Sequence, residues 1–71
     1  MPLSFAPMGE ETIITHVTGK PETRRHLEDL GLVSGARVTP ISQIGGNLIL
    51  GVKGSRLAIS REMAQKIIVN P

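Results

Sequence analysis

The sequence contains no cysteine, no tryptophan and no tyrosine, and Phe5 is its one aromatic residue. Without cysteine, the chain cannot form disulfides, thiolate metal sites or a cysteine nucleophile. Small secreted domains usually depend on disulfides, so we expect a reducing, cytoplasmic location. Proteins that read single-stranded nucleic acid stack bases on aromatic side chains, and one phenylalanine cannot build such a platform. These absences favour a binding or regulatory module.

Long hydrophobic runs are also absent. No stretch approaches the ~20 apolar residues of a membrane-spanning helix, and the first nine residues lack the features of a signal peptide. The 71 residues are enough for one small domain, which we expect to span 1–71. A hydrophobic fraction of 39% is sufficient for a thin core and too high for a disordered tail.

The charge is unevenly distributed along the chain, although the net charge is only +2. Residues 1–35 carry three basic and five acidic side chains, whereas residues 36–71 carry five basic side chains and one acidic side chain. A solvated exterior is the simpler interpretation of the basic half. The alternative is a docking face for an acidic partner.

Runs rich in β-branched and aliphatic residues predict five short strands, at Glu11–Val17, Arg37–Ile44, Leu48–Val52, Arg56–Ser60 and Ile67–Val69. Pro40 lies inside the second run and predicts an edge or a bulge there. An edge at this point leaves room for weak self-association. Gly45, Gly46 and Asn47 predict a hairpin turn, because these residues tolerate positive φ.

Two helical segments interrupt the strands. Pro21 suits the first position of a helix, and Gly31 suits its end, with Leu32 folding back on the last turn. Ser60 can cap a single helical turn that runs through Gln65. Five strands joined by glycine-rich turns, with one helix after the first and a helical turn before the last, predict an all-β fold: a small barrel, whose closure removes exposed sheet edges.

The segment from Arg24 to Val38 reads RRHLEDLGLVSGARV. It resembles the signature of the FeoA family (ferrous iron transport protein A), which is roughly R-x-x-L-x-x-L-G-L-x-P-G-x-x-V. The opening MPLSFAPMGEETIITHVTG and the closing GSRLAISREMAQKIIVNP resemble the family's ends. Two residues depart from the pattern: Ser34 replaces the family proline, and His26 stands where the family often has a basic residue.

This resemblance implies an SH3-like β-barrel of the cytoplasm. Family members work beside FeoB, a large membrane protein with a cytoplasmic GTP-binding domain that moves ferrous iron inward. The small protein is an accessory without a catalytic group. The same barrel also occurs as the terminal domain of metal-dependent repressors.

His16 and His26 are the candidate metal ligands, since ferrous iron accepts imidazole and carboxylate. A good site needs three or more converging ligands, and the two histidines lie on different predicted elements. We therefore expect no metal site, with weak contact at His16 or His26 left open, and no cofactor. The serines belong to no nucleophile motif, and the glycines are explained by turns, so we expect no enzyme activity.

A docking site should expose apolar groups that the core does not use. The predicted partner-binding residues are the turn after the helix and two basic strand residues: Leu32, Val33, Ser34, Gly35, Arg37 and Arg56. In the alternative reading, Leu32 is a capping contact. Leu3, Phe5 and Met8 could dock a partner or plug the open end of the barrel, and we favour the plug.

The sequence therefore predicts a cytoplasmic accessory of ferrous iron uptake that acts by contact with FeoB, and that reaches the membrane only through this partner. One alternative is a small basic barrel that binds nucleic acid. The modest net charge and the lack of aromatic residues count against it. The other alternative is a stand-alone relative of the SH3-like domain of metal-dependent repressors.

Overall fold

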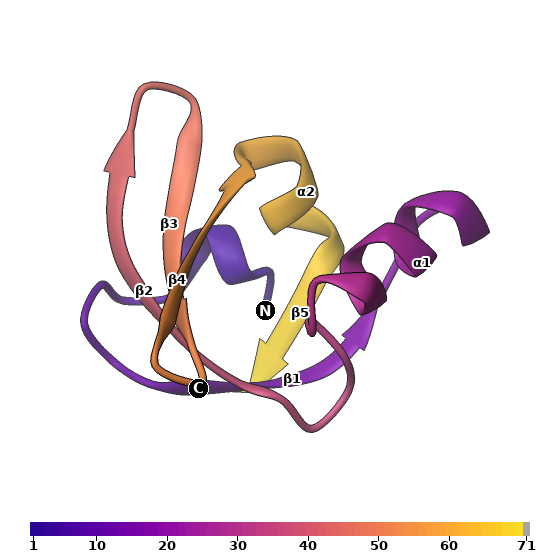
Figure 1. Cartoon of the computed structure of the whole chain (residues 1–71), viewed down its shortest axis with the longest axis horizontal. Coiled ribbons are helices and arrows are strands. Elements are labelled where there is room, and N and C mark those ends of the chain that lie inside the picture. Colours follow the sequence, from indigo (N-terminus) through magenta and orange to yellow (C-terminus); the bar gives the residue numbers. More distant parts are fainter. Residues whose placement is uncertain (71) are drawn as a thin grey trace.

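The structure is a computed structural model that describes residues 1–70. Its elements follow the predicted order, with one unpredicted addition, the short 3-10 helix η1 near the N-terminus. Figure 1 shows them in chain order: η1 (Leu3–Phe5), β1 (Thr12–Val17), α1 (Pro21–Asp29), β2 (Arg37–Ile44), β3 (Asn47–Val52), β4 (Ser55–Ser60), α2 (Arg61–Lys66) and β5 (Ile67–Asn70).

The five strands form one antiparallel sheet in the order β4-β3-β2-β1-β5. The sheet curls on itself, and α1 lies to one side of it (Figure 1). The N-terminal residue runs along the outer edge of β5. The Met1 amino group donates a 3.0 Å hydrogen bond to the Val69 carbonyl, and the Val69 N–H donates to the Met1 carbonyl at 2.8 Å.

The bulge predicted at Pro40 is confirmed. The β2–β3 register shifts between Pro40 and Ser42, so Ile41 is the extra residue. Pro40 is fully buried, and its carbonyl accepts a hydrogen bond from the Gly9 N–H. A bulge bends the strand that carries it. Here it lies where β2 leaves β1, since β1 and β2 pair only at Thr12–Val38 and Ile13–Arg37.

The end of α1 is fixed by glycine, as predicted. Gly31 has φ +89°, and its N–H donates to the Glu28 carbonyl at 2.9 Å, while the Leu32 N–H donates to the Leu27 carbonyl at 2.9 Å. These two hydrogen bonds form the Schellman motif, in which a hydrophobic residue after the glycine contacts one in the last turn of the helix. Leu27 and Leu32 are both fully buried, so this motif anchors α1 to the core.

The start of α2 is fixed by Ser60. Its hydroxyl accepts a 3.2 Å hydrogen bond from the Met63 N–H, which is the predicted cap. The core beneath both helices is entirely aliphatic, and its residues come from every element. They are Leu3, Ala6, Ile14, Leu27, Leu32, Val38, Leu48, Leu50, Val52, Ile59, Ala64, Ile67 and Val69.

The N-terminal plug is confirmed for one of its three residues. Leu3 is buried in the core, together with Ala6. Phe5 and Met8 instead expose 74% and 44% of their surface. The 3-10 helix η1 holds Leu3 and Phe5 and directs their side chains to different sides, whereas Met8 lies beyond it. Among residues 1–70, no helix has the length and apolar character to cross a membrane.

Candidate functional site

One open concavity of about 610 Å³ is lined by residues from three separate segments of the chain. We call it the Arg37 hollow. Its walls come from the residue before β1, the turn before β2, the first half of β2, and the end of β3 with its following turn. The lining residues are Glu11, Gly35, Ala36, Arg37, Thr39, Gly51, Lys53 and Gly54.

The floor of the hollow is open because Gly51 has no side chain. A Cβ built on Gly51 would lie 3.4 Å from the Cδ1 atom of Ile41 and 3.7 Å from the Thr39 carbonyl oxygen. Gly51 pairs with Thr39 on one side and with Arg56 on the other. Residues that face each other across antiparallel strands project to the same side of the sheet. Arg56 therefore borders the hollow from β4.

The rim of the hollow is held by a β-turn. The Ala36 N–H donates a 3.0 Å hydrogen bond to the Val33 carbonyl, and Gly35 has φ +87° at the third turn position, where glycine is favoured. The Gly35 N–H donates to the Ile14 carbonyl at 2.7 Å. The turn is thus tied directly to β1, and this tie places it beside Arg37.

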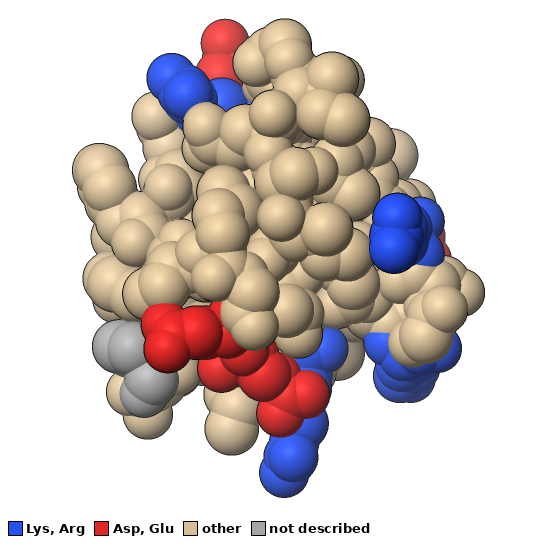
Figure 2. Space-filling view, turned by 90° about the vertical axis from the view of Figure 1, so that its left-hand side faces the viewer, with Lys and Arg blue, Asp and Glu red and all other residues tan. Residues whose placement is uncertain are grey.

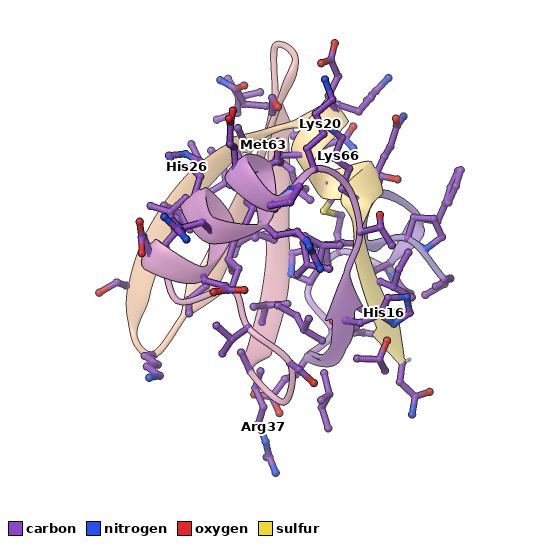
Figure 3. The ribbon with its side chains drawn as sticks, turned by 90° about the vertical axis from the view of Figure 1, so that its right-hand side faces the viewer. His16, Lys20, His26, Arg37, Met63 and Lys66 are labelled. Atoms are coloured by element: carbon purple, nitrogen blue, oxygen red, sulfur yellow. The ribbon has the colours of Figure 1, made fainter. Side chains whose placement is uncertain are left out.

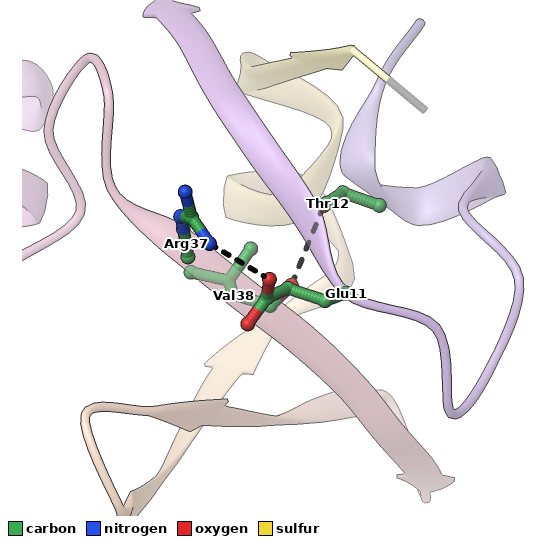
Figure 4. A network of polar contacts seen from close by, with 4 residues as sticks. All are labelled: Glu11, Thr12, Arg37 and Val38. Atoms are coloured by element: carbon green, nitrogen blue, oxygen red, sulfur yellow. Dashed lines mark hydrogen bonds and ion pairs between the residues drawn. The ribbon is translucent and has the colours of Figure 1, made fainter.

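The electrostatic character of the hollow comes from two cations and one carboxylate. Arg37 and Glu11 form an ion pair with 3.6 Å between Nη1 and Oε1, and their side chains expose 70% and 57% of their surface. Beside this pair, the Thr12 hydroxyl donates to the Val38 carbonyl at 3.5 Å, and Figure 4 shows both contacts. Exposed ion pairs contribute at most about 1 kcal/mol to stability, so Arg37 is held loosely.

The second cation, Lys53, lies at the tip of the β3–β4 hairpin. Val52 and Ser55 are paired, so Lys53 and Gly54 form a two-residue turn. Both have positive φ, +51° and +79°, as a type I′ turn requires. This turn places Lys53 in the lining of the hollow, together with Arg37.

The charged border lies next to a large uncharged surface. Figure 2 shows a broad face whose centre carries no Lys, Arg, Asp or Glu side chain, with charged groups at its lower edge, its upper left and its right. Exposed apolar side chains of the chain include Ile41, which contacts the Gly51 position, and Ile44 at the end of β2. Exposed apolar side chains close to charged groups are typical of a protein-contact site.

The predicted partner-binding residues fall into two groups. Gly35 and Arg37 line the hollow, Arg56 borders it, and Val33 and Ser34 form the adjoining turn with 41% of the Val33 surface exposed. Leu32 does not belong to this surface. It is fully buried, so the capping alternative describes it, because the Schellman motif turns its side chain inward.

Six lining residues were not predicted as site residues: Glu11, Ala36, Thr39, Gly51, Lys53 and Gly54. Lys53 was visible in the sequence as part of a tight turn and as one of the basic residues of the second half. What places it near Arg37 is the pairing of β3 between β2 and β4. No local pattern in the sequence predicts that β3 pairs with both β2 and β4.

The two histidines lie apart. His26 projects from α1 and His16 from β1, on opposite sides of the view in Figure 3. The Nδ1 atom of His16 lies 3.2 Å from the Thr15 hydroxyl. Within residues 1–70, no group of three or more His, Cys, Asp or Glu side chains could hold a metal ion.

Comparison with known proteins places these features in a family. The model of the FeoA domain matches residues 1–71. A curated relative from Methanocaldococcus jannaschii, provisionally named Fe(2+) transport protein A, is 35% identical over 68 residues, which cover 96% of this chain and 83% of the relative.

Solved structures agree with this match. A crystal structure of an iron uptake regulatory protein (FeoA) is 30% identical, with a TM-score of 0.88, and the match covers 97% of this chain and 92% of that one. A zinc-bound FeoA from Stenotrophomonas maltophilia, described as a prokaryotic SH3 domain protein, is 25% identical with a TM-score of 0.84, covering 99% of this chain and 89% of that one. The predicted SH3-like fold is confirmed.

Metal-dependent repressors share the fold. A manganese-dependent transcriptional repressor has a TM-score of 0.91 at 16% identity, and the match covers 99% of this chain but only 35% of the repressor. At this identity the likeness shows the fold alone.

Proposed function

The chain belongs to the FeoA family, and from this premise we propose that it is an accessory protein of ferrous iron transport. It acts in the cytoplasm by binding another protein rather than by catalysis. Its partner is the cytoplasmic part of FeoB, the GTP-binding membrane transporter of the same system. Through this partner the chain is held at the membrane.

The observation that carries the proposal is the Arg37 hollow. It is an open surface on a rigid sheet, it combines Arg37 and Lys53 with an exposed aliphatic side chain, and its rim is the turn of the family signature. A small barrel whose rigid surface is already formed loses little conformational entropy on binding. Its contact can therefore favour one assembly or nucleotide state of the transporter over another.

Co-purification from membranes tests this proposal. The transporter is solubilised in mild detergent and captured with the native chain or with a double variant, Val33→Asp with Arg37→Glu. We expect the native chain to retain the transporter and the variant to lose it. Both substituted side chains are exposed, so the variant should keep its fold.

The matched control is Met8→Asp with Arg25→Glu, which makes the same chemical changes away from the hollow. Met8 is exposed to nearly the same extent as Val33. If the native chain captures no transporter, the proposed function is wrong. If both double variants still capture the transporter, the hollow is not the contact surface.

A further inference from the structure

We propose that the Arg37 hollow binds an extended acidic segment of the partner protein, in which a carboxylate and an aliphatic side chain stand two residues apart and therefore face the same side. The carboxylate enters between Arg37 and Lys53, and the aliphatic side chain packs on Ile41. This inference rests on the proposed function, because the segment belongs to the protein that the chain is proposed to assist.

The cations are available to an incoming carboxylate. Arg37 makes one ion pair, at 3.6 Å, and the fork of its guanidinium carries five N–H donors. Among residues 1–70, Lys53 has no ion-pair partner. An incoming carboxylate can therefore take the place of the Glu11 carboxylate in the ion pair with Arg37. It can also form a second ion pair, with Lys53.

The shape of the hollow favours a peptide backbone. Three of its lining residues, Gly35, Gly51 and Gly54, have no side chain to obstruct the approach of a chain. Its volume of about 610 Å³ lies within the range of sites that hold a ligand of several residues or a drug-sized molecule. At Gly51, which has no side chain, the backbone of a bound peptide can come close to the backbone of β3.

An aliphatic residue near the carboxylate follows from Ile41. Val38 and Pro40 are buried, so Ile41 lies on the outer face of β2, where it exposes 37% of its surface and lies against the Gly51 position. A ligand that carried only charges would leave the Ile41 side chain uncovered.

The observations favour a peptide over a nucleic acid or a nucleotide. The lining of the hollow contains no aromatic side chain on which a base could stack. Glu11 also lines the hollow. Its negative charge repels a chain of phosphates more strongly than it repels one carboxylate.

The backbone of Lys53 supports a role for its side chain. A φ of +51° is unfavourable for lysine, and this turn type is normally formed by Asn or Gly. Strained residues concentrate at functional positions. What lysine contributes here, and Asn or Gly would not, is a positive charge above the hollow.

Peptide titration of the full ¹⁵N-labelled chain tests the inference. The probes are a capped hexapeptide Ser-Glu-Ser-Leu-Ser-Glu (the Glu-Leu peptide), in which Glu and Leu stand two residues apart, the same peptide with Lys in place of Glu, inorganic phosphate, and a short single-stranded RNA. We expect the Glu-Leu peptide to shift the amide signals of Gly35, Gly51 and Gly54, with a Kd that rises steeply with salt.

Two variants sharpen the test. Lys53→Gln removes the charge, and Gly51→Val fills the floor of the hollow; each should weaken Glu-Leu binding by about tenfold. Gly46→Val is the matched control for Gly51→Val, since Gly46 also has no positive φ and its Cβ position is open. It should leave the Kd unchanged.

Equal binding of the Lys-Leu peptide, tighter binding of phosphate or RNA, or signal shifts confined to other surfaces would overturn the inference. Capture of the transporter from membranes is measured with the same variants, Lys53→Gln and Gly51→Val. Capture that survives both Lys53→Gln and Gly51→Val overturns the inference and leaves the proposed function standing. Peptide binding by a native chain that captures no transporter overturns the proposed function, and with it the assignment of the segment to that partner.

Discussion

The Ser34 hydroxyl donates a 2.8 Å hydrogen bond to the carbonyl of Thr15. This bond fastens the turn beside the Arg37 hollow to β1 from a position at which the family usually has proline. Proline favours such a turn by restricting φ at its second position. Ser34 achieves a similar restriction through a contact across the fold.

Removing this bond should weaken the turn measurably. We expect Ser34→Ala to lower the free energy of unfolding by about 0.5–1 kcal/mol, the usual net value of one hydrogen bond. Urea denaturation measures the change. Ser34→Pro is the informative companion, because it loses the bond but regains the φ restriction, and its stability should lie closer to that of the native chain. A Ser34→Ala variant as stable as the native chain would show that the bond contributes nothing.

Adjacent residues of the signature should respond very differently to truncation. Leu32 is fully buried and Val33 is largely exposed. We expect Leu32→Ala to cost about 2–5 kcal/mol through lost burial and a residual cavity. Val33→Ala should change stability by less than about 0.5 kcal/mol. Thermal unfolding followed by circular dichroism compares the two, and similar losses for both would contradict the assigned burial.

Lys53 should be replaceable with a gain in stability. In the left-handed region Asn is preferred over lysine, so Lys53→Asn should raise the free energy of unfolding by about 0.5–1 kcal/mol. The same variant should bind the acidic peptide less tightly. Differential scanning calorimetry and the peptide titration give the two readouts. A variant that loses stability would show that φ +51° imposes no strain here.

Glu11 should act as an internal competitor for Arg37. The pair is exposed at both ends, so Glu11→Gln should change stability by less than about 1 kcal/mol. It should also tighten binding of the Glu-Leu peptide, because Arg37 then has no carboxylate to release. Isothermal titration at low salt measures the affinity, and weaker binding by this variant would contradict the exchange.

The histidines should be dispensable for transport. They project from different elements on opposite sides of the molecule (Figure 3). We expect a His16→Ala, His26→Ala double variant to support ferrous iron uptake as the native chain does, measured with ⁵⁵Fe in cells that lack the native protein. A large loss of uptake by a stably folded double variant would give one of them a direct role with the metal.

The strands and helix ends were predictable because their signals are local. Pro40 predicts a bulge, Gly31 a helix end and Ser60 a cap, since each acts through its own φ or hydroxyl on residues close in sequence. The structure places all three as expected. Four strand bounds differ from the prediction by one residue each, at Thr12, Asn47, Ser55 and Asn70.

The composition of the hollow was only partly predictable. Gly35 was predicted from the turn after the helix and Arg37 as a basic strand residue, whereas Lys53 and Gly51 reach the same place only because β3 pairs between β2 and β4. Leu32 shows the reverse case. It was predicted as a partner-binding residue together with Val33, although the helix end at Gly31 already predicted that it folds back, and the structure buries it.

The exchange of hydrogen bonds between Met1 and Val69 has a practical consequence. Because the first residue sits at a sheet edge and donates through its amino group, an affinity tag fused ahead of it would replace the ammonium group by an amide N–H and crowd β5. The proximity of Met1 to Val69 also makes the molecule suitable for circular permutation, with a short linker bridging the ends and new termini opened at the Gly45–Gly46 hairpin.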